Sequence, residues 1–144
     1  KLGVTTVGIT CCPNTPLTKL ADISICAVVG PEVLTGSTRM KSATAQKMVL
    51  NMLTTTSMIK SGKIYQNLMV DVKASNEKLM ARAIRIVMQA TDCNYDVSKE
   101  ALTRANNSAK MAILLLLTGA SLEEGEALLT HHHGYLRKAV EQNL

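Results

Sequence analysis

Two short runs of β-branched and aliphatic residues predict strands near the start of the chain. Val4 to Thr10 and Ile23 to Val29 are almost continuously apolar or β-branched, and the Gly30-Pro31 turn follows the second run. The Pro-rich segment between them is typical of a loop, and residues 17–21 leave room for one helical turn. Near-continuous apolar strands joined by a crossover are typical of parallel strands buried on both faces. Because two strands are too few for a stable sheet, we expect further strands from a preceding segment or from another chain.

The pattern becomes helical from residue 38 to residue 60. Apolar side chains recur there at spacings that place them on one helix face, and Ser61-Gly62 ends the segment. The members of this apolar face are Met48, Val49, Met52, Leu53 and Ile59. The sequence predicts five further helices, at residues 75–91, 98–106, 108–117, 122–130 and 135–142. Ser75, Ser98, Ser108 and Ser121 are their predicted N-caps.

Composition supports an aliphatic, largely helical core. The chain has 144 residues, of which 47% are hydrophobic but only 2% aromatic, with no Phe and no Trp. Leu, Ile, Val, Met and Ala must therefore fill the interior. The predicted architecture is a remnant of a parallel sheet, one long helix and a C-terminal helical cluster.

The net charge of +5 does not predict a nucleic-acid interface, because the Lys and Arg residues are spread along the chain and almost no aromatic side chains are available for base stacking. A local anion site explains the excess charge better. Cys11, Cys12, Cys26 and Cys93 lack metal-ligand or disulfide spacing and are expected to be reduced thiols. The longest apolar run, Met111 to Leu117, is far shorter than the roughly 18 residues that span a bilayer, and no signal-peptide pattern is present. We expect a cytoplasmic protein that does not enter a membrane.

The first candidate site is the loop that follows the second predicted strand. A helix beginning at Ser37 or Thr38 would present free backbone N–H groups there, which form an anion site. Arg39 and Lys41 would then lie in the first turn, where each positive charge costs about 0.3–1 kcal/mol against the helix dipole unless an anion binds. In the alternative interpretation Glu32 neutralises Arg39 and Ser37 only caps the helix.

The second candidate site lies on the helix predicted at residues 75–91. Lys78 and Arg82 are separated by four residues, so they project from the same helix face and repel by about 0.2–0.5 kcal/mol. A shared anionic ligand would make the pair favourable. The alternative is a solvated basic face with Glu77 and Asp71 nearby.

No metal centre or nucleophile motif is evident. His131, His132 and His133 are adjacent, whereas histidines that share a metal on a helix need spacings of three or four residues, so a turn closed by Gly134 is the better interpretation. The sequence has no G-x-S-x-G elbow, no P-loop and no G-x-G-x-x-G loop. Among the acidic residues, only Glu32 lies where a reacting group would be expected.

Two long motifs resemble a known family. The run GPEVLTGSTRMKSATAQKMVLNMLTT and the following MIKSGKIYQNLMVDVKASNEKLMARA are similar to the signature region of the bacterial N-acetylmuramic acid 6-phosphate etherases. The similarity extends from TVGITC near the start to HHGYLRKAV near the end. More distantly, residues 62–83 also resemble the second sugar-isomerase domain of the glucokinase regulatory protein.

The resemblance implies an α/β fold. Residues 1–62 would be the C-terminal part of a sugar-isomerase (SIS) domain with a doubly wound parallel sheet, and residues 63–144 a small all-helical subdomain. The family cleaves the D-lactyl ether of N-acetylmuramic acid 6-phosphate, yielding N-acetylglucosamine 6-phosphate and D-lactate in cell-wall recycling. Its members are homodimers, so a dimer through the SIS-domain helices is expected. No cofactor is expected.

The same resemblance assigns candidate residues to substrate binding but none to catalysis. The family's catalytic glutamates and phosphate-binding Ser/Thr loops belong to a segment preceding this one, so the isolated chain is expected to be inactive. The residues that match the family signature lining the substrate cleft are Glu32, Thr35, Ser37, Arg39 and Lys41. The residues that match the basic helix touching the sugar phosphate in the regulatory relative are Asn76, Lys78 and Arg82. Two alternatives stay open, a non-catalytic phosphosugar-binding regulatory protein and a purely structural helical domain.

Overall fold

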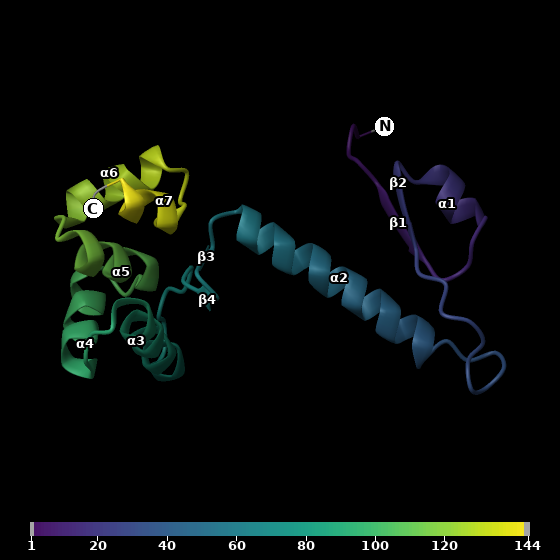
Figure 1. The fold of residues 1–144 in the computed structure, drawn as a ribbon, viewed down its shortest axis with the longest axis horizontal. Helices are drawn as coiled ribbons and strands as arrows, with labels where there is room; N and C mark the ends of the chain where they lie inside the picture. The colour runs from purple at the N-terminus through teal and green to yellow at the C-terminus, as the bar shows by residue number, and fades with distance from the viewer. Residues whose placement is uncertain (1, 143–144) are drawn as a thin grey trace. The chain divides into compact units, whose positions relative to one another are not determined.

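The computed structural model describes residues 2–142, and it divides the chain into two compact units, Lys1–Thr56 and Ser57–Leu144. We call them unit 1 and unit 2. Their architecture is a small parallel sheet in unit 1 and a helical bundle in unit 2 (Figure 1). A mixed α/β chain with helices concentrated at its end was predicted from the sequence, and this prediction is confirmed.

The sheet of unit 1 consists of two parallel strands. Strands β1 (Val7–Thr10) and β2 (Ile23–Cys26) pair from Val7 opposite Ile23 to Thr10 opposite Cys26, and helix α1 (Pro16–Leu20) forms the crossover. Gly8 allows α1 to pack closely, because a Cβ at this position would lie 3.0 Å from the Cβ of Ala21. Both predicted strands are confirmed as parallel, although each is shorter than the apolar run that predicted it.

Helix α2 (Lys41–Lys60) begins in unit 1 and ends in unit 2. It starts three residues later than the predicted start at residue 38, and it ends as predicted before Gly62, which has a left-handed φ of +67°. Its apolar residues are not buried within the described part of the chain. Met48 is 52% exposed and Met52 57% exposed, so the residues of unit 1 leave much of the predicted apolar face uncovered.

Unit 2 opens with a small antiparallel hairpin that the sequence did not predict. Strands β3 (Ile64–Tyr65) and β4 (Leu68–Met69) pair through a two-residue turn, in which Gln66 adopts a left-handed φ of +53°. Two-residue strands produce no detectable alternation of apolar and polar residues. The turn also lacks the glycine that signals most tight hairpins.

Five helices follow the hairpin: α3 (Glu77–Thr91), α4 (Tyr95–Arg104), α5 (Ala109–Thr118), α6 (Leu122–His131) and α7 (Leu136–Glu141). All five correspond to predicted helices. The predicted caps Ser108 and Ser121 are confirmed, and Ser121 forms a full capping box with Glu124. The other two were wrong, because Asn76 caps α3 in place of Ser75 and Asn94 caps α4 in place of Ser98.

The core of unit 2 is aliphatic, as its composition predicts. Helix α5 packs against α3, α4, α6 and α7, and six of its ten residues are buried. The largest fully buried apolar side chains are Val70, Val87, Leu102, Ile113, Leu114 and Leu136. All belong to unit 2. No helix within residues 2–142 is both long enough and apolar enough to cross a membrane.

Candidate functional site

The first candidate site is arranged around a carboxylate. Glu32, in the loop after β2, accepts hydrogen bonds from the backbone N–H of Lys41 and of Ser42, each at 3.1 Å. These two N–H groups open helix α2 and have no partner within the helix. The prediction that the helix starts at Ser37 or Thr38 was therefore wrong, since a carboxylate nine residues earlier fixes the start at Lys41. The predicted anion position at this helix terminus is occupied by the protein's own Glu32.

These contacts lower the pKa of Glu32 below its ordinary value of 4.5. The hydrogen bond from the Ser42 N–H is the largest cause, followed by the bond from the Lys41 N–H, and the nearby positive charge of Lys41 adds to them. Each stabilises the ionised carboxylate. Glu32 is thus held as an anion that anchors the first turn of α2.

We expect the anchoring of α2 by Glu32 to fail in acid. The pKa of Glu32 is lower in the folded chain than in the unfolded chain, where it is near 4.5. The stabilisation that ionised Glu32 gives to α2 is therefore complete above pH 4.5 and is lost as the pH falls through the folded pKa. The amide resonances of Lys41 and Ser42 should therefore shift together in an NMR titration, with a midpoint below 4.5. The variant Glu32→Gln should abolish this shift, and a midpoint at or above 4.5 in the wild type would contradict the assigned role.

Two basic residues border an open pocket beside this cap. Arg39 and Lys41 line a cavity of about 790 Å³ together with Val29, Met40, Thr44 and Ala45. Lys41 is the first residue of α2, but Arg39 precedes the helix, so the expectation that both lie in its first turn holds only for Lys41.

The remaining residues of this candidate site lie in the loop before α2. The Ser37 hydroxyl accepts a hydrogen bond from the Arg39 N–H at 3.3 Å, so Ser37 orders this loop and does not cap the helix. Thr35 is exposed in the same loop. Among the described residues Arg39 forms no ion pair with Glu32, so the alternative in which Glu32 neutralises Arg39 is not observed.

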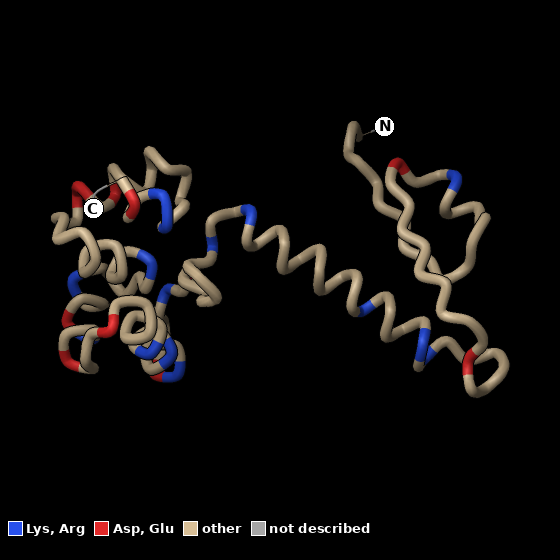
Figure 2. The backbone as a smooth tube through the Cα atoms, viewed as in Figure 1, with Lys and Arg blue, Asp and Glu red and all other residues tan. Residues whose placement is uncertain are grey.

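The second candidate site is a basic stripe on α3. Lys78, Arg82 and Arg85 are all exposed and follow one another at spacings of four and three residues. Figure 2 shows the basic positions along the backbone in blue. The opposite face carries the buried Ala83 and Val87. Sequence reasoning missed Arg85, although its spacing of seven from Lys78 places it on the same face.

No carboxylate neutralises this stripe within residues 2–142. Asp71, proposed as a possible neighbour, pairs instead with Lys63 at 3.5 Å and with Lys110 at 3.3 Å. The three positive side chains on α3 therefore form no ion pair with a described residue, which is compatible with a solvated basic face and with a surface that receives an anion.

Asn76 has a structural role at the start of α3. Its side-chain oxygen accepts a hydrogen bond from the Leu79 N–H at 2.9 Å, and only its NH₂ group is left to contact a ligand. Asn76 also borders a pocket of about 630 Å³ that includes Tyr95 and Lys99. The candidate residues thus form two groups, one around the start of α2 in unit 1 and one on α3 in unit 2.

His132 and His133 lie in the predicted turn between α6 and α7, and His131 is the last residue of α6. His132 is the C-cap of α6 and is buried, and the rings of His131 and His132 meet edge to face with centroids 4.8 Å apart. His133 and Gly134 both have left-handed φ values, which reverse the chain direction. Among residues 2–142 no group of three or more His, Cys, Asp or Glu side chains is placed to hold a metal ion.

The helical part of unit 2 matches a known class of domain. A family model described as the C-terminal lid domain of glucokinase regulatory protein matches residues 66–111, which run from the β3–β4 turn to the start of α5. This segment of unit 2 is therefore similar to a lid domain.

Similarity to curated proteins covers nearly the whole chain. It is 59% identical over 140 residues to an N-acetylmuramic acid 6-phosphate etherase of Colwellia psychrerythraea, covering 97% of this chain and 46% of the relative. It is 57% identical over 143 residues to an etherase of the same name from Vibrio campbellii, covering 99% of this chain and 46% of the relative. It is 61% identical over 141 residues to that of Actinobacillus succinogenes, covering 98% of this chain and 46% of the relative. The chain is similar to N-acetylmuramic acid 6-phosphate etherases over nearly all of its own residues, and it spans about half the length of the curated relatives it matches.

Proposed function

We propose that this chain is part of an enzyme that cleaves the D-lactyl ether of N-acetylmuramic acid 6-phosphate. The observation that carries the proposal is identity of 57% to 61% with proteins named as etherases of this substrate, over at least 97% of the chain. The proposed products are N-acetylglucosamine 6-phosphate and D-lactate. Because no nucleophile motif is evident in this sequence and Glu32 caps a helix, we assign the chain substrate binding and assembly, and we expect the isolated chain to release no lactate.

The two basic groups suit the two anions of the proposed substrate, its phosphate and its lactyl carboxylate. Lys78 and Arg82 are exposed, unpaired among the described residues and spaced on one helix face. Arg39 and Lys41 border a pocket next to the Glu32 cap. Charged hydrogen bonds to phosphate or carboxylate are the strong ones, so each group provides a suitable anchor. Under this proposal Glu32 acts by fixing the start of α2 and hence the position of Lys41, while Thr35, Ser37 and Asn76 order the loops beside the ligand.

Removing charge from α3 should weaken substrate binding. We suggest a hybrid in which this chain replaces its matched segment in the Vibrio campbellii relative. In this hybrid Lys78→Ala should reduce the calorimetric affinity for N-acetylmuramic acid 6-phosphate about tenfold or more, because a charged hydrogen bond to the ligand is lost. Arg104→Ala, which removes a positive charge from the exposed end of α4, is the matched control and should leave the affinity within about twofold. Equal affinities for the two variants would exclude Lys78 from the site.

A second candidate function is a phosphosugar-binding regulator without catalysis. It is favoured by the match of residues 66–111 to the lid domain of glucokinase regulatory protein. A regulator would bind the sugar phosphate in the hybrid and depend on Lys78 in the same way, but it would not turn the ligand over. A purely structural helical domain would not bind it at all.

The proposal extends to assembly and location. We propose that residues 1–62 complete a SIS-type doubly wound sheet domain and that residues 63–144 form its helical subdomain. The protein is proposed to be a cytoplasmic homodimer that uses the SIS-domain helices and no cofactor. The exposed apolar side chains of α2 support the dimer, because they require a cover that the described residues do not supply.

A further inference from the structure

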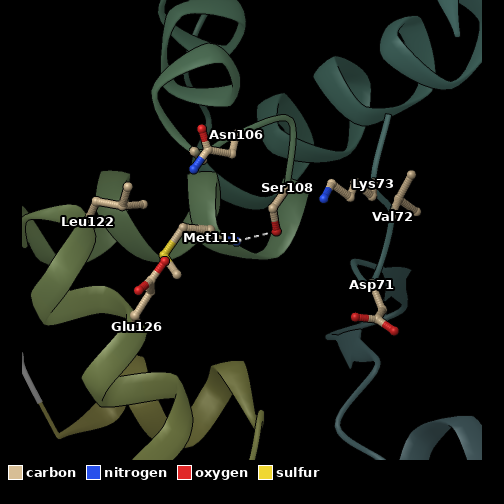
Figure 3. A pocket seen from close by; sticks show the side chains of 9 residues that line it. Asp71, Val72, Lys73, Asn106, Ser108, Met111, Leu122 and Glu126 are labelled. Carbon is tan, nitrogen blue, oxygen red and sulfur yellow. Dashed lines mark hydrogen bonds between the residues drawn. The ribbon is translucent and has the colours of Figure 1, made fainter. Parts of the chain in front are cut away.

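A pocket in unit 2 lies apart from the two basic groups. Its volume is about 510 Å³, and its walls come from residues 71–73, the α4–α5 connection, α5 and α6 (Figure 3). None of the residues proposed above for substrate binding lines it. Its size falls within the range of about 300–1,000 Å³ typical of small-molecule sites.

The floor of this pocket is apolar. Met111 and Ala105 line it and are almost fully buried, at 7% and 2% exposure. Val72 and Leu122 are half-buried and also line it. An aliphatic group placed here would be removed from water on several sides, which is favourable.

The rim carries opposite charges from different parts of the bundle. Lys73 lies on one wall and its nitrogen points into the pocket, whereas Glu126 extends from α6 on the facing wall (Figure 3). Both side chains are exposed, and neither forms an ion pair with a described residue. A ligand can therefore meet a free ammonium group on one side and a free carboxylate on the other.

Neutral hydrogen-bonding groups lie between these charges. The Ser108 oxygen accepts a hydrogen bond from the Met111 N–H at 3.4 Å, which leaves its hydroxyl hydrogen to donate into the pocket. Asn106 presents its side-chain amide at the same rim (Figure 3). Asp71 also lines the pocket, but its charge is already offset by Lys63 and Lys110.

We propose that this pocket binds a small zwitterion with an apolar side chain, that is, an amino acid or a short peptide. The ligand's carboxylate pairs with Lys73, its ammonium group with Glu126, and its side chain rests on Met111 and Leu122. A doubly charged phosphate would leave the Glu126 carboxylate facing a like charge, whereas the ammonium group of a zwitterion pairs with it. The inference does not depend on the proposed function.

The test uses ligands that differ by one charge. Binding of glycyl-L-leucine to the 144-residue chain is followed by the NMR shifts of the pocket amides. N-acetylglycyl-L-leucine lacks the ammonium group and glycyl-L-leucinamide lacks the carboxylate, and each should bind about three- to tenfold more weakly. Free L-leucine is measured in parallel. A higher affinity for L-leucine than for glycyl-L-leucine would indicate an amino-acid site, and a lower affinity would indicate a peptide site.

Two variants assign the charges to residues. With Glu126→Gln, glycyl-L-leucine should bind no better than its N-acetylated analogue; with Lys73→Met, it should bind no better than its amide. Glu123→Gln, on the same helix but outside the pocket, should preserve both preferences. These side chains are exposed, so each variant should keep the wild-type thermal unfolding midpoint. The proposal is overturned if neither zwitterion shifts the pocket amides at about 10 mM, or if both variants retain the wild-type preferences.

Discussion

Replacing Gly62 with alanine should destabilise the chain by about 3 kcal/mol. Gly62 follows the last turn of α2 with a φ of +67°, and a Cβ at this position would lie 2.9 Å from the carbonyl oxygen of Gly134. The contact is with backbone, which cannot rotate away. The Tyr135 hydroxyl donates to the Lys60 carbonyl, so a hydrogen bond two residues before the glycine also joins the end of α2 to the α6–α7 turn. An alanine would force these segments apart.

Gly119 provides a matched control for this change. It has a φ of +70° in the same unit, at the end of α5, but no atom lies within 4 Å of the position of a Cβ. Gly119→Ala should therefore cost only the left-handed backbone strain, about 1 kcal/mol. Urea unfolding of the two variants, followed by circular dichroism, separates the strain from the steric clash. Equal losses of unfolding free energy would show that α2 is not tightly bound to the α6–α7 turn.

Periodicity predicted the helices correctly because the bundle buries aliphatic faces. The caps were harder to predict. Ser75 and Asn76 are adjacent and both are good N-cap residues, so local preference does not choose between them. Ser98 failed as a cap because it belongs to the buried face of α4, at spacings of three and four residues from Ala101 and Leu102. That spacing is visible in the sequence, but a serine within an apolar face is easily taken for a helix start.

The start of α2 could not be derived from local sequence. Its two terminal N–H groups are bound by Glu32, nine and ten residues away, and such a cap depends on the path of the loop between them. The exposure of α2 could not be predicted from the sequence either. Spacing predicted an apolar face, but only the tertiary structure shows that unit 1 leaves much of it exposed.

For the candidate sites, sequence supplied the residues and structure supplied their surroundings. The spacing of Lys78 and Arg82 already placed them on one face, and the structure adds Arg85 and the absence of a neutralising carboxylate among the described residues. The charged pocket between residues 71–73 and α6 had no sequence signal, because Lys73 and Glu126 are brought together only by the packing of the bundle.

Release of D-lactate from N-acetylmuramic acid 6-phosphate tests the proposed function most directly. The protein to assay is the hybrid in which this chain replaces the matched 46% of the Vibrio campbellii relative, with that relative as the positive control. We predict lactate release within about tenfold of the relative's rate, because 57% identity over the matched segment should preserve the packing of the replaced part. The isolated chain should release none. A folded hybrid that binds the substrate but releases no lactate would contradict the proposal that this chain belongs to an active etherase.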